Sequence, residues 1–187
     1  MMWILIAIVI VAGLVIGMYN SLIGLRVRCD NAWSDIDVQL KRRYDLIPNV
    51  VETVKGYAGH ERETLEGVVA ARNKAMTVQG PAAKAEAEGM LTQALRQVFA
   101  LAEAYPQLRA VESFTQLQQT LNQIEDTVQN ARRYYNAIVR DLNTKISVFP
   151  SNIIANMFGF KPREFFEISA PAEREVPKVS FGAGAAQ

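Results

Sequence analysis

The chain begins with an uninterrupted apolar run that strongly constrains its fold. No charged or strongly polar side chain occurs from Met1 to Met18, and the first charge is Arg26. A run of this length suits a helix that crosses a bilayer and is too long for a buried strand. The sequence therefore predicts a transmembrane anchor over residues 1–25.

Residues around this run favour a retained, single-pass anchor. Gly17-Met18-Tyr19 matches a small-residue cleavage site poorly, so we expect no cleaved signal peptide. Trp3 and Tyr19 lie about 24 Å apart at helical rise, near the two headgroup zones that such rings favour. Basic residues cluster only downstream, at Arg26, Arg28, Lys41, Arg42 and Arg43. The positive-inside rule then predicts a cytoplasmic C-terminal domain, with a periplasmic or extracellular domain as the alternative.

Two glycines of the anchor have the spacing of a helix-association motif. Gly13 and Gly17 lie four residues apart, on one face of a helix. Small residues at this spacing let two helix backbones approach closely in a membrane. We therefore expect the anchors to associate with one another at these two positions.

The apolar pattern does not stop at the end of the anchor. Apolar positions recur every three or four residues as far as Ala58, so the anchor and the first bundle helix are predicted to be one rod. Pro48 falls inside this stripe and should kink the rod, because proline removes one helical hydrogen bond. Further helices are predicted over residues 60–78, 82–104 and 106–149, the last with a spacing close to that of a coiled coil. Ser151 is predicted to cap a short final helix.

These elements predict an all-α fold. The N-terminal transmembrane helix should continue into an antiparallel bundle of about four long helices plus a short C-terminal helix, spanning residues 26–168. Residues 169–187 lack apolar periodicity and are predicted to form a flexible tail. The net charge of +1, with both signs interspersed, argues against nucleic acid as a partner. Cys29 is the only cysteine and is expected to be a small apolar core residue.

The motifs of common enzymes are missing. His60 is the only histidine, and Thr64 stands where an H-E-x-x-H zinc motif needs its second histidine. Tyr57 stands where a di-iron Glu-x-x-His motif needs its glutamate. No glycine-rich phosphate loop opens a helix. We therefore expect no catalytic, cofactor-binding or metal site, and no enzymatic activity.

Two polar groups remain for interactions within or between chains. If the first and last long helices lie side by side, acids of one could pair with arginines of the other, the candidates being Asp35, Asp37, Asp45, Arg132, Arg133 and Arg140. Solvated pairs of this kind contribute about 0–1 kcal/mol each, whereas a partly buried network would determine helix register. The second hypothesis predicts that Asp37→Ala shifts the melting temperature.

An aromatic cluster follows the last long helix. Its members are Phe158, Phe160, Phe165 and Phe166. They either close the end of the bundle or line a groove where a partner docks.

Several blocks of the chain resemble the LemA family. The longest is AWSDIDVQLKRRYDLIPN at residues 32–49, followed by ETVKGYA at 52–58 and HE at 60–61. Shorter matches are YN at 19–20, AR at 71–72, EAYP at 103–106, ARRYYN at 131–136, FPSN at 149–152 and FGF at 158–160. The resemblance covers nearly the whole chain before the predicted tail.

This resemblance implies a bacterial single-pass protein of the cytoplasmic (inner) membrane, with a helical bundle and no established enzymatic activity. Relatives include a magnetosome-associated protein, and members are often encoded beside a TPM-domain membrane protein or a membrane protease. We therefore expect a homo-oligomeric scaffold or membrane-organising protein whose partners are the lipid bilayer and further copies of itself. The alternative is an accessory subunit or adaptor of a membrane protease or another membrane enzyme.

Overall fold

A computed structural model describes residues 1–167, and within them the chain is helical and contains no strand. The helices are α1 (Met2–Lys55), α2 (Arg62–Thr77), α3 (Pro81–Ala104), α4 (Pro106–Arg109), α5 (Glu112–Ser147) and α6 (Ser151–Met157). The predicted all-α bundle with long first and last helices is confirmed. The predicted tail over residues 169–187 lies outside the described residues.

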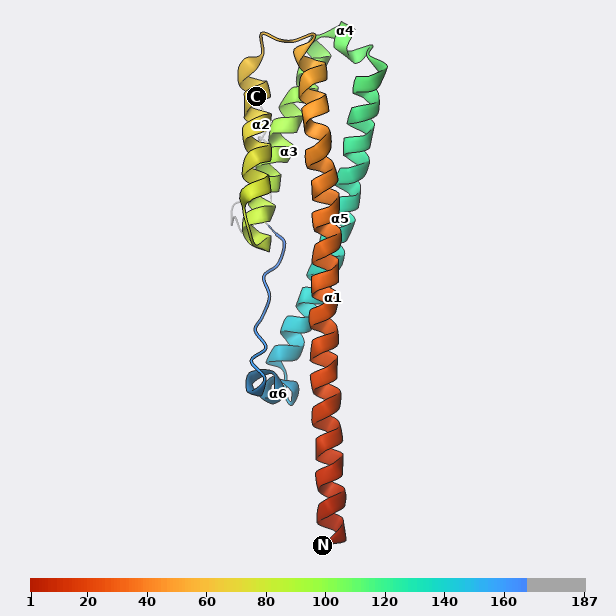
Figure 1. The fold of residues 1–187 in the computed structure, drawn as a ribbon, viewed down its shortest axis with the longest axis vertical. Coiled ribbons are helices and arrows are strands. Elements are labelled where there is room, and N and C mark those ends of the chain that lie inside the picture. Colours follow the sequence, from red (N-terminus) through yellow and green to blue (C-terminus); the bar gives the residue numbers. More distant parts are fainter. Residues whose placement is uncertain (168–187) are drawn as a thin grey trace, which may run out of the picture.

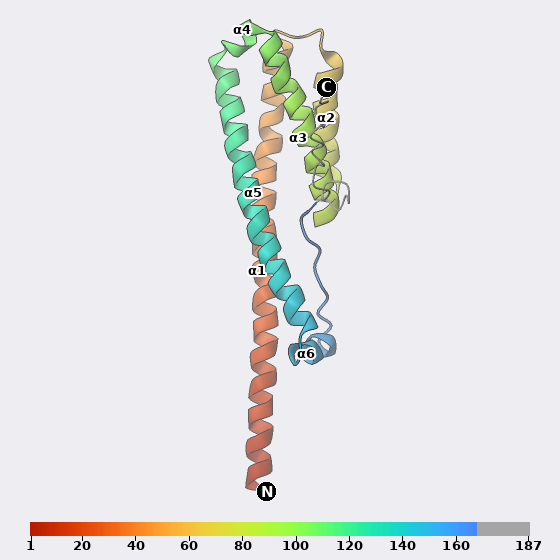
Figure 2. The same cartoon turned by 180° about the vertical axis from the view of Figure 1, so that it is seen from behind.

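Helix α1 is the axis of the molecule. It spans 54 residues, and its first part projects alone beyond the bundle (Figure 1). Its remainder packs antiparallel to α5, while α2 and α3 pair with each other beside it (Figures 1 and 2). Helix α4 crosses the end of the bundle farthest from the N-terminus, and α6 lies beside α1 at the opposite end of α5 (Figure 1). The bundle therefore lies at one end of the projecting part of α1.

One stripe of α1 supplies much of the core. Its buried positions begin at Leu22 and recur at helical spacing: Leu22, Cys29, Ala32, Ile36, Leu40, Arg43, Tyr44, Ile47, Val50 and Val54. Helix α5 contributes a matching series: Phe114, Leu121, Val128, Tyr135, Ile138, Val139, Leu142 and Ile146. Cys29 is fully buried, and this burial raises the pKa of its thiol, so it belongs to the core.

Helix α1 continues through Pro48, and Figures 1 and 2 show no sharp bend in it. Proline has no N–H group, so the carbonyl of Tyr44, four residues earlier, loses its usual helical partner. The guanidinium of Arg72 on α2 takes that place, because its Nε donates to Tyr44 O at 2.8 Å. The predicted kink is therefore replaced by a side-chain hydrogen bond that also ties α2 to α1.

The predicted helix over residues 106–149 is divided. Helix α4 ends at Arg109, and Val111 adopts an extended conformation before α5 begins. Leu108 and Phe114 are both buried, yet six residues correspond to a rotation of about 240° around one continuous helix. The break lets both side chains reach the core.

Replacing Arg72 should test the bond to the Tyr44 carbonyl. We expect Arg72→Met to lower the free energy of unfolding by about 1–2 kcal/mol, since a partly buried acceptor loses a charged donor. In a Pro48→Ala background the loss should be smaller, because the introduced alanine would supply a backbone N–H to the same carbonyl. Chemical unfolding of the full chain in detergent, followed by circular dichroism, measures both values. Arg62→Met, an exposed change on the same helix, is the control. Equal losses in the two backgrounds would contradict the assignment.

Candidate functional site

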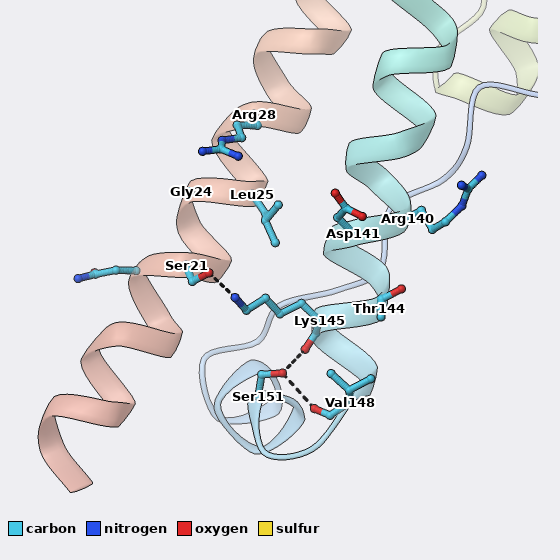
Figure 3. A pocket seen from close by; sticks show the side chains of 11 residues that line it. Ser21, Gly24, Leu25, Arg28, Arg140, Asp141, Thr144, Lys145, Val148 and Ser151 are labelled. Atoms are coloured by element: carbon cyan, nitrogen blue, oxygen red, sulfur yellow. Dashed lines mark hydrogen bonds between the residues drawn. The ribbon is translucent and has the colours of Figure 1, made fainter. Parts of the chain in front are cut away.

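A cavity of about 710 Å³ lies between α1 and α5 where the projecting part of α1 begins. Figure 3 shows Leu25, Asp141 and Lys145 in the gap between the two helices, above the turn into α6, while Arg28 and Arg140 extend outward at its rim. Helix α1 contributes Asn20, Ser21, Gly24, Leu25 and Arg28; α5, the following turn and the first residue of α6 contribute Arg140, Asp141, Thr144, Lys145, Val148 and Ser151. The cavity is thus placed just beyond the apolar run of residues 1–18.

Positive charge predominates around this cavity. Arg28, Arg140 and Lys145 line it together with one carboxylate, Asp141. Lys145 Nζ donates to Ser21 Oγ across the gap between the helices (Figure 3). Guanidinium and ammonium groups at the rim of such a cavity favour a nearby anionic group such as a phosphate, which can accept hydrogen bonds from them.

Ser151 closes the lower side of the cavity. Its Oγ lies 2.6 Å from Lys145 O and 3.0 Å from Val148 O, two carbonyls at the C-terminal end of α5 (Figure 3). Ser151 therefore caps the C-terminus of α5, and the prediction that it caps the final helix is wrong. The bond holds α6 close under α5.

A second site is a buried ionic network between α1, α3 and α5. Arg43 Nη1 donates to Glu88 Oε2 at 2.9 Å, and its Nη2 donates to Thr92 Oγ1 at 2.8 Å. The same Nη2 lies 3.1 Å from Glu125 Oε2 as an ion pair without hydrogen-bond alignment. Tyr44 Oη donates to the other Glu88 oxygen. The guanidinium of Arg43 is therefore shared by the carboxylates of Glu88 and Glu125.

This network borders a cavity of about 430 Å³ that Arg96 and Arg132 also line. Burial raises the pKa of Glu88 above its ordinary value, although Tyr44 and Arg43 both oppose the shift. Burial and the hydrogen bond to Glu88 also raise the pKa of Tyr44. A protonated Glu88 could donate to Tyr44 Oη, which would then donate to Ala75 O, 3.4 Å away. Both protonation states of Glu88 can thus be accommodated.

Residues 160–167 form an extended segment, here called the strap, that α5 holds by side-chain hydrogen bonds. Asn136 bonds both backbone groups of Phe166, at 2.8 Å to its N and 3.2 Å to its O. Asn143, two turns later, bonds Arg163 in the same way, at 2.8 Å and 2.9 Å. Tyr135 Oη donates to Glu164 O at 3.0 Å. These side-chain hydrogen bonds hold the strap along α5, although the strap is not paired in a β-sheet.

The acids and arginines predicted to pair do not form the expected network within residues 1–167. Asp35, Asp37 and Asp45 are exposed, and Asp45 pairs with Lys41 one turn away, at 3.0 Å. This placement removes the reason to expect a melting-temperature shift from Asp37→Ala. The physical cause is that these acids lie outside the buried stripe of α1.

The predicted arginines have separate roles. Arg132 Nε donates to Phe166 O at 2.8 Å in the strap, and Arg133 is exposed and donates to Asn130 on its own helix. Arg140 lines the cavity of Figure 3. Sequence reasoning missed Arg43 and Glu88, although Arg43 lies between Leu40 and Ile47 on the apolar stripe, a signal that could have identified it.

The four phenylalanines of the predicted docking cluster divide into two groups. Phe158 and Phe160 lie against Tyr19, with ring centroids 4.7 Å and 6.0 Å away. Phe166 is buried against Trp33, 5.7 Å between centroids, while Phe165 is partly buried. Phe166 therefore belongs to the core, and Phe158 belongs to the end of the bundle near the apolar run.

The structure also locates His60 and the two anchor glycines. Within residues 1–167, no group of three or more His, Cys, Asp or Glu side chains is placed to hold a metal ion. His60 is exposed in the connection between α1 and α2. Gly13 and Gly17 lie on the projecting part of α1, and apart from the neighbouring residues and backbone of that helix no described atom lies within 4 Å of a Cβ placed on either of them.

Comparisons with known proteins agree with the predicted family. The profile of the LemA family matches residues 32–181. Magnetosome proteins MamQ 1 and MamQ 2 of Paramagnetospirillum magneticum are each 25% identical over 175 residues, covering 80% of this chain and 64% of the relative. Protein LemA of Metamycoplasma hominis is 27% identical over 158 residues, covering 82% of this chain and 71% of the relative. The chain thus spans less than two thirds of the magnetosome proteins, and none of these names is that of an enzyme.

Glu88→Gln should reveal the titration of the buried network. A raised pKa means that, above the ordinary value of 4.5, the folded chain holds a proton that the unfolded chain has released. This group's contribution to stability therefore decreases as the pH rises from that value through the raised pKa. When the free energy of unfolding is measured from acidic to neutral pH, it should decrease less for Glu88→Gln than for the wild type. Glu86→Gln, an exposed change on the same helix, should retain the wild-type slope.

Removing the amides that hold the strap should release its backbone. We expect Asn136→Ala and Asn143→Ala each to cost about 1 kcal/mol of stability and to speed exchange of the Phe166 and Arg163 amide hydrogens, respectively. Hydrogen–deuterium exchange of the full chain measures this directly. Asn122→Ala, an exposed change on the same helix, should leave both amides protected. Unchanged exchange in the first two variants would show that other contacts hold the strap.

Proposed function

Because this chain belongs to the LemA family, we propose that it is a membrane-anchored, non-catalytic helical bundle that acts as a homo-oligomeric scaffold at a bacterial inner membrane. Relatives named for the magnetosome, a cell structure rather than a reaction, favour a structural role. The bundle would lie on the cytoplasmic side, where the positive-inside rule places Arg26 and Arg28.

The observation that carries the proposal is the exposed apolar part of α1. This helix is long and apolar enough to cross a membrane, and none of its most apolar window is buried within the described chain. A core helix of a water-soluble protein would instead have its apolar face covered by other elements. The projecting part of α1 therefore needs a bilayer, another chain, or both.

The glycine face of the projecting helix favours a second copy. Gly13, Gly17 and Gly24 are separated by four and seven residues, which places them on one face of α1. Apart from the neighbouring residues and backbone of α1 itself, nothing in the described chain lies within 4 Å of a Cβ built on any of them. In a bilayer, helices gain little from burying apolar area, so close backbone packing at small residues becomes the main source of affinity.

Self-association can be tested by adding bulk to this face. We expect the wild-type chain in mild detergent to be oligomeric by multi-angle light scattering. Gly13→Leu with Gly17→Leu should shift it toward monomer, because the leucines would hold the backbones apart. Val11→Leu, on the opposite side of α1, is the matched control and should leave the mass unchanged.

A monomeric wild-type protein would overturn the scaffold proposal. Purification of the protein from native membranes would then test the alternative role, that of an accessory subunit or adaptor. A stoichiometric foreign subunit, such as a membrane protease or a TPM-domain protein, would favour an accessory or adaptor role.

A further inference from the structure

The end of the bundle beside the projecting helix carries a group of exposed apolar side chains, here called the α6 patch. Its members are Val148, Phe149, Ile153, Met157 and Phe158. Phe149 is 79% exposed and Met157 is 68% exposed, although both side chains are large and apolar. Such side chains are usually covered when several of them occur together.

Helix α6 is apolar on two sides. It buries Ile154 and Ala155 against the bundle and exposes Ile153 and Met157 on its outer side. A surface helix normally has one apolar face and one polar face. The outer face of α6 therefore has the composition of a surface that meets an apolar medium.

The α6 patch lies at the level where the membrane span ends. A bilayer core of about 30 Å requires about twenty residues of helix, which places the end of the span near Ser21 of α1. Tyr19 lies within that last turn, and its ring is 4.7 Å from that of Phe158. Val15 and Met18, also within the span, pack against the core of the bundle. Figure 1 shows α6 beside α1 where the helix leaves the bundle.

The distribution of charged residues around the α6 patch also fits a position at the membrane surface. No charged residue occurs from Phe149 to Phe160, whereas Lys145 precedes this stretch and Lys161 follows it. Aromatic rings favour the interfacial zone of a bilayer, and flanking lysines can extend their ammonium groups toward the headgroups. The cations Arg28 and Arg140 line the cavity directly above, where lipid phosphates would lie.

We propose that α6 and the turn before it are seated in the interfacial zone of the bilayer, so that the α6 patch contacts lipid beside the span. The occupant of this surface is the lipid leaflet, because the patch is continuous with the last turns of the membrane-spanning helix. The inference rests on the proposed anchoring by α1 and adds a second membrane contact. Two contacts would hold the bundle at one orientation to the membrane, which a single helix alone does not do.

Depth-dependent quenching tests the contact in the full chain. Cysteine would be introduced singly as Met157→Cys or Ile153→Cys in a Cys29→Ala background and labelled with an environment-sensitive fluorophore. The protein would be reconstituted into nanodiscs of phosphatidylcholine and phosphatidylglycerol. Lipids carrying a nitroxide near the headgroup should quench both labels and shift their emission to the blue. Both positions are exposed, so labelling should not disturb the core.

Two further labels make the outcome interpretable. Met76→Cys replaces an exposed methionine on α2, a helix that does not reach the level of α6 (Figure 1), and its label should remain unquenched. Ile8→Cys lies in the middle of the span and should be quenched by a nitroxide deep in the acyl chains.

Quenching at Ile8 without quenching at Met157 and Ile153 would overturn the α6 contact and leave the anchoring intact. Loss of quenching at Ile8 would overturn the anchoring and the α6 contact together. Blue-shifted emission at Met157 without quenching would mean that another protein surface covers the patch, and would also overturn it.

Discussion

The antiparallel packing of α1 against α5 is the contact on which the rest of the structure depends. It requires α1 to present one apolar stripe without interruption from Leu22 to Val54, and Pro48 lies inside that stripe. The hydrogen bond from Arg72 to the Tyr44 carbonyl satisfies the acceptor that proline leaves free, so the helix continues. The same bond comes from α2. Continuity of the long helix and attachment of the second helix pair are therefore parts of one arrangement.

Polar side chains determine how the other elements are placed on this pair. Arg43 joins α1 to α3 through Glu88 and to α5 through Glu125, and the pKa of Glu88 is raised because burial outweighs the nearby positive charge. Burying such charges adds little net stability, but an unpaired charge is costly, so the network disfavours other helix registers. Asn136 and Asn143 act similarly for the strap, since each amide satisfies both backbone groups of one residue. Apolar packing brings the helices together, and these groups select their positions.

Most of the features that favour a role at a membrane occur within a few turns of α1. The apolar span ends there, the cavity lined by Arg28, Arg140 and Lys145 opens there, and α6 lies beside Tyr19. The opposite end of the bundle carries α4 and the loop with His60. Neither this end nor any other part of residues 1–167 contains a group of side chains placed to hold a metal ion. A rigid rod that joins span and bundle would transmit contacts made in the membrane to the orientation of the bundle. This coupling is what the proposed scaffold role requires.

The sequence by itself determined the apolar run, the helical period and the family, because these depend on residue order along one chain. The starts of α3 and α4 and the ends of α1 and α5 followed closely from Pro81, Pro106, Pro150 and the glycines before α2. The partners of the polar residues were decided only by the tertiary structure. The position of Arg43 on the apolar stripe of α1 indicates burial, but its partners Glu88 and Glu125 come from α3 and α5. The division of α4 from α5 likewise depends on Leu108 and Phe114 meeting one core. Periodicity tells which side of a helix is covered, but the groups that cover it come from distant parts of the chain, and their positions are known only when the helices are packed.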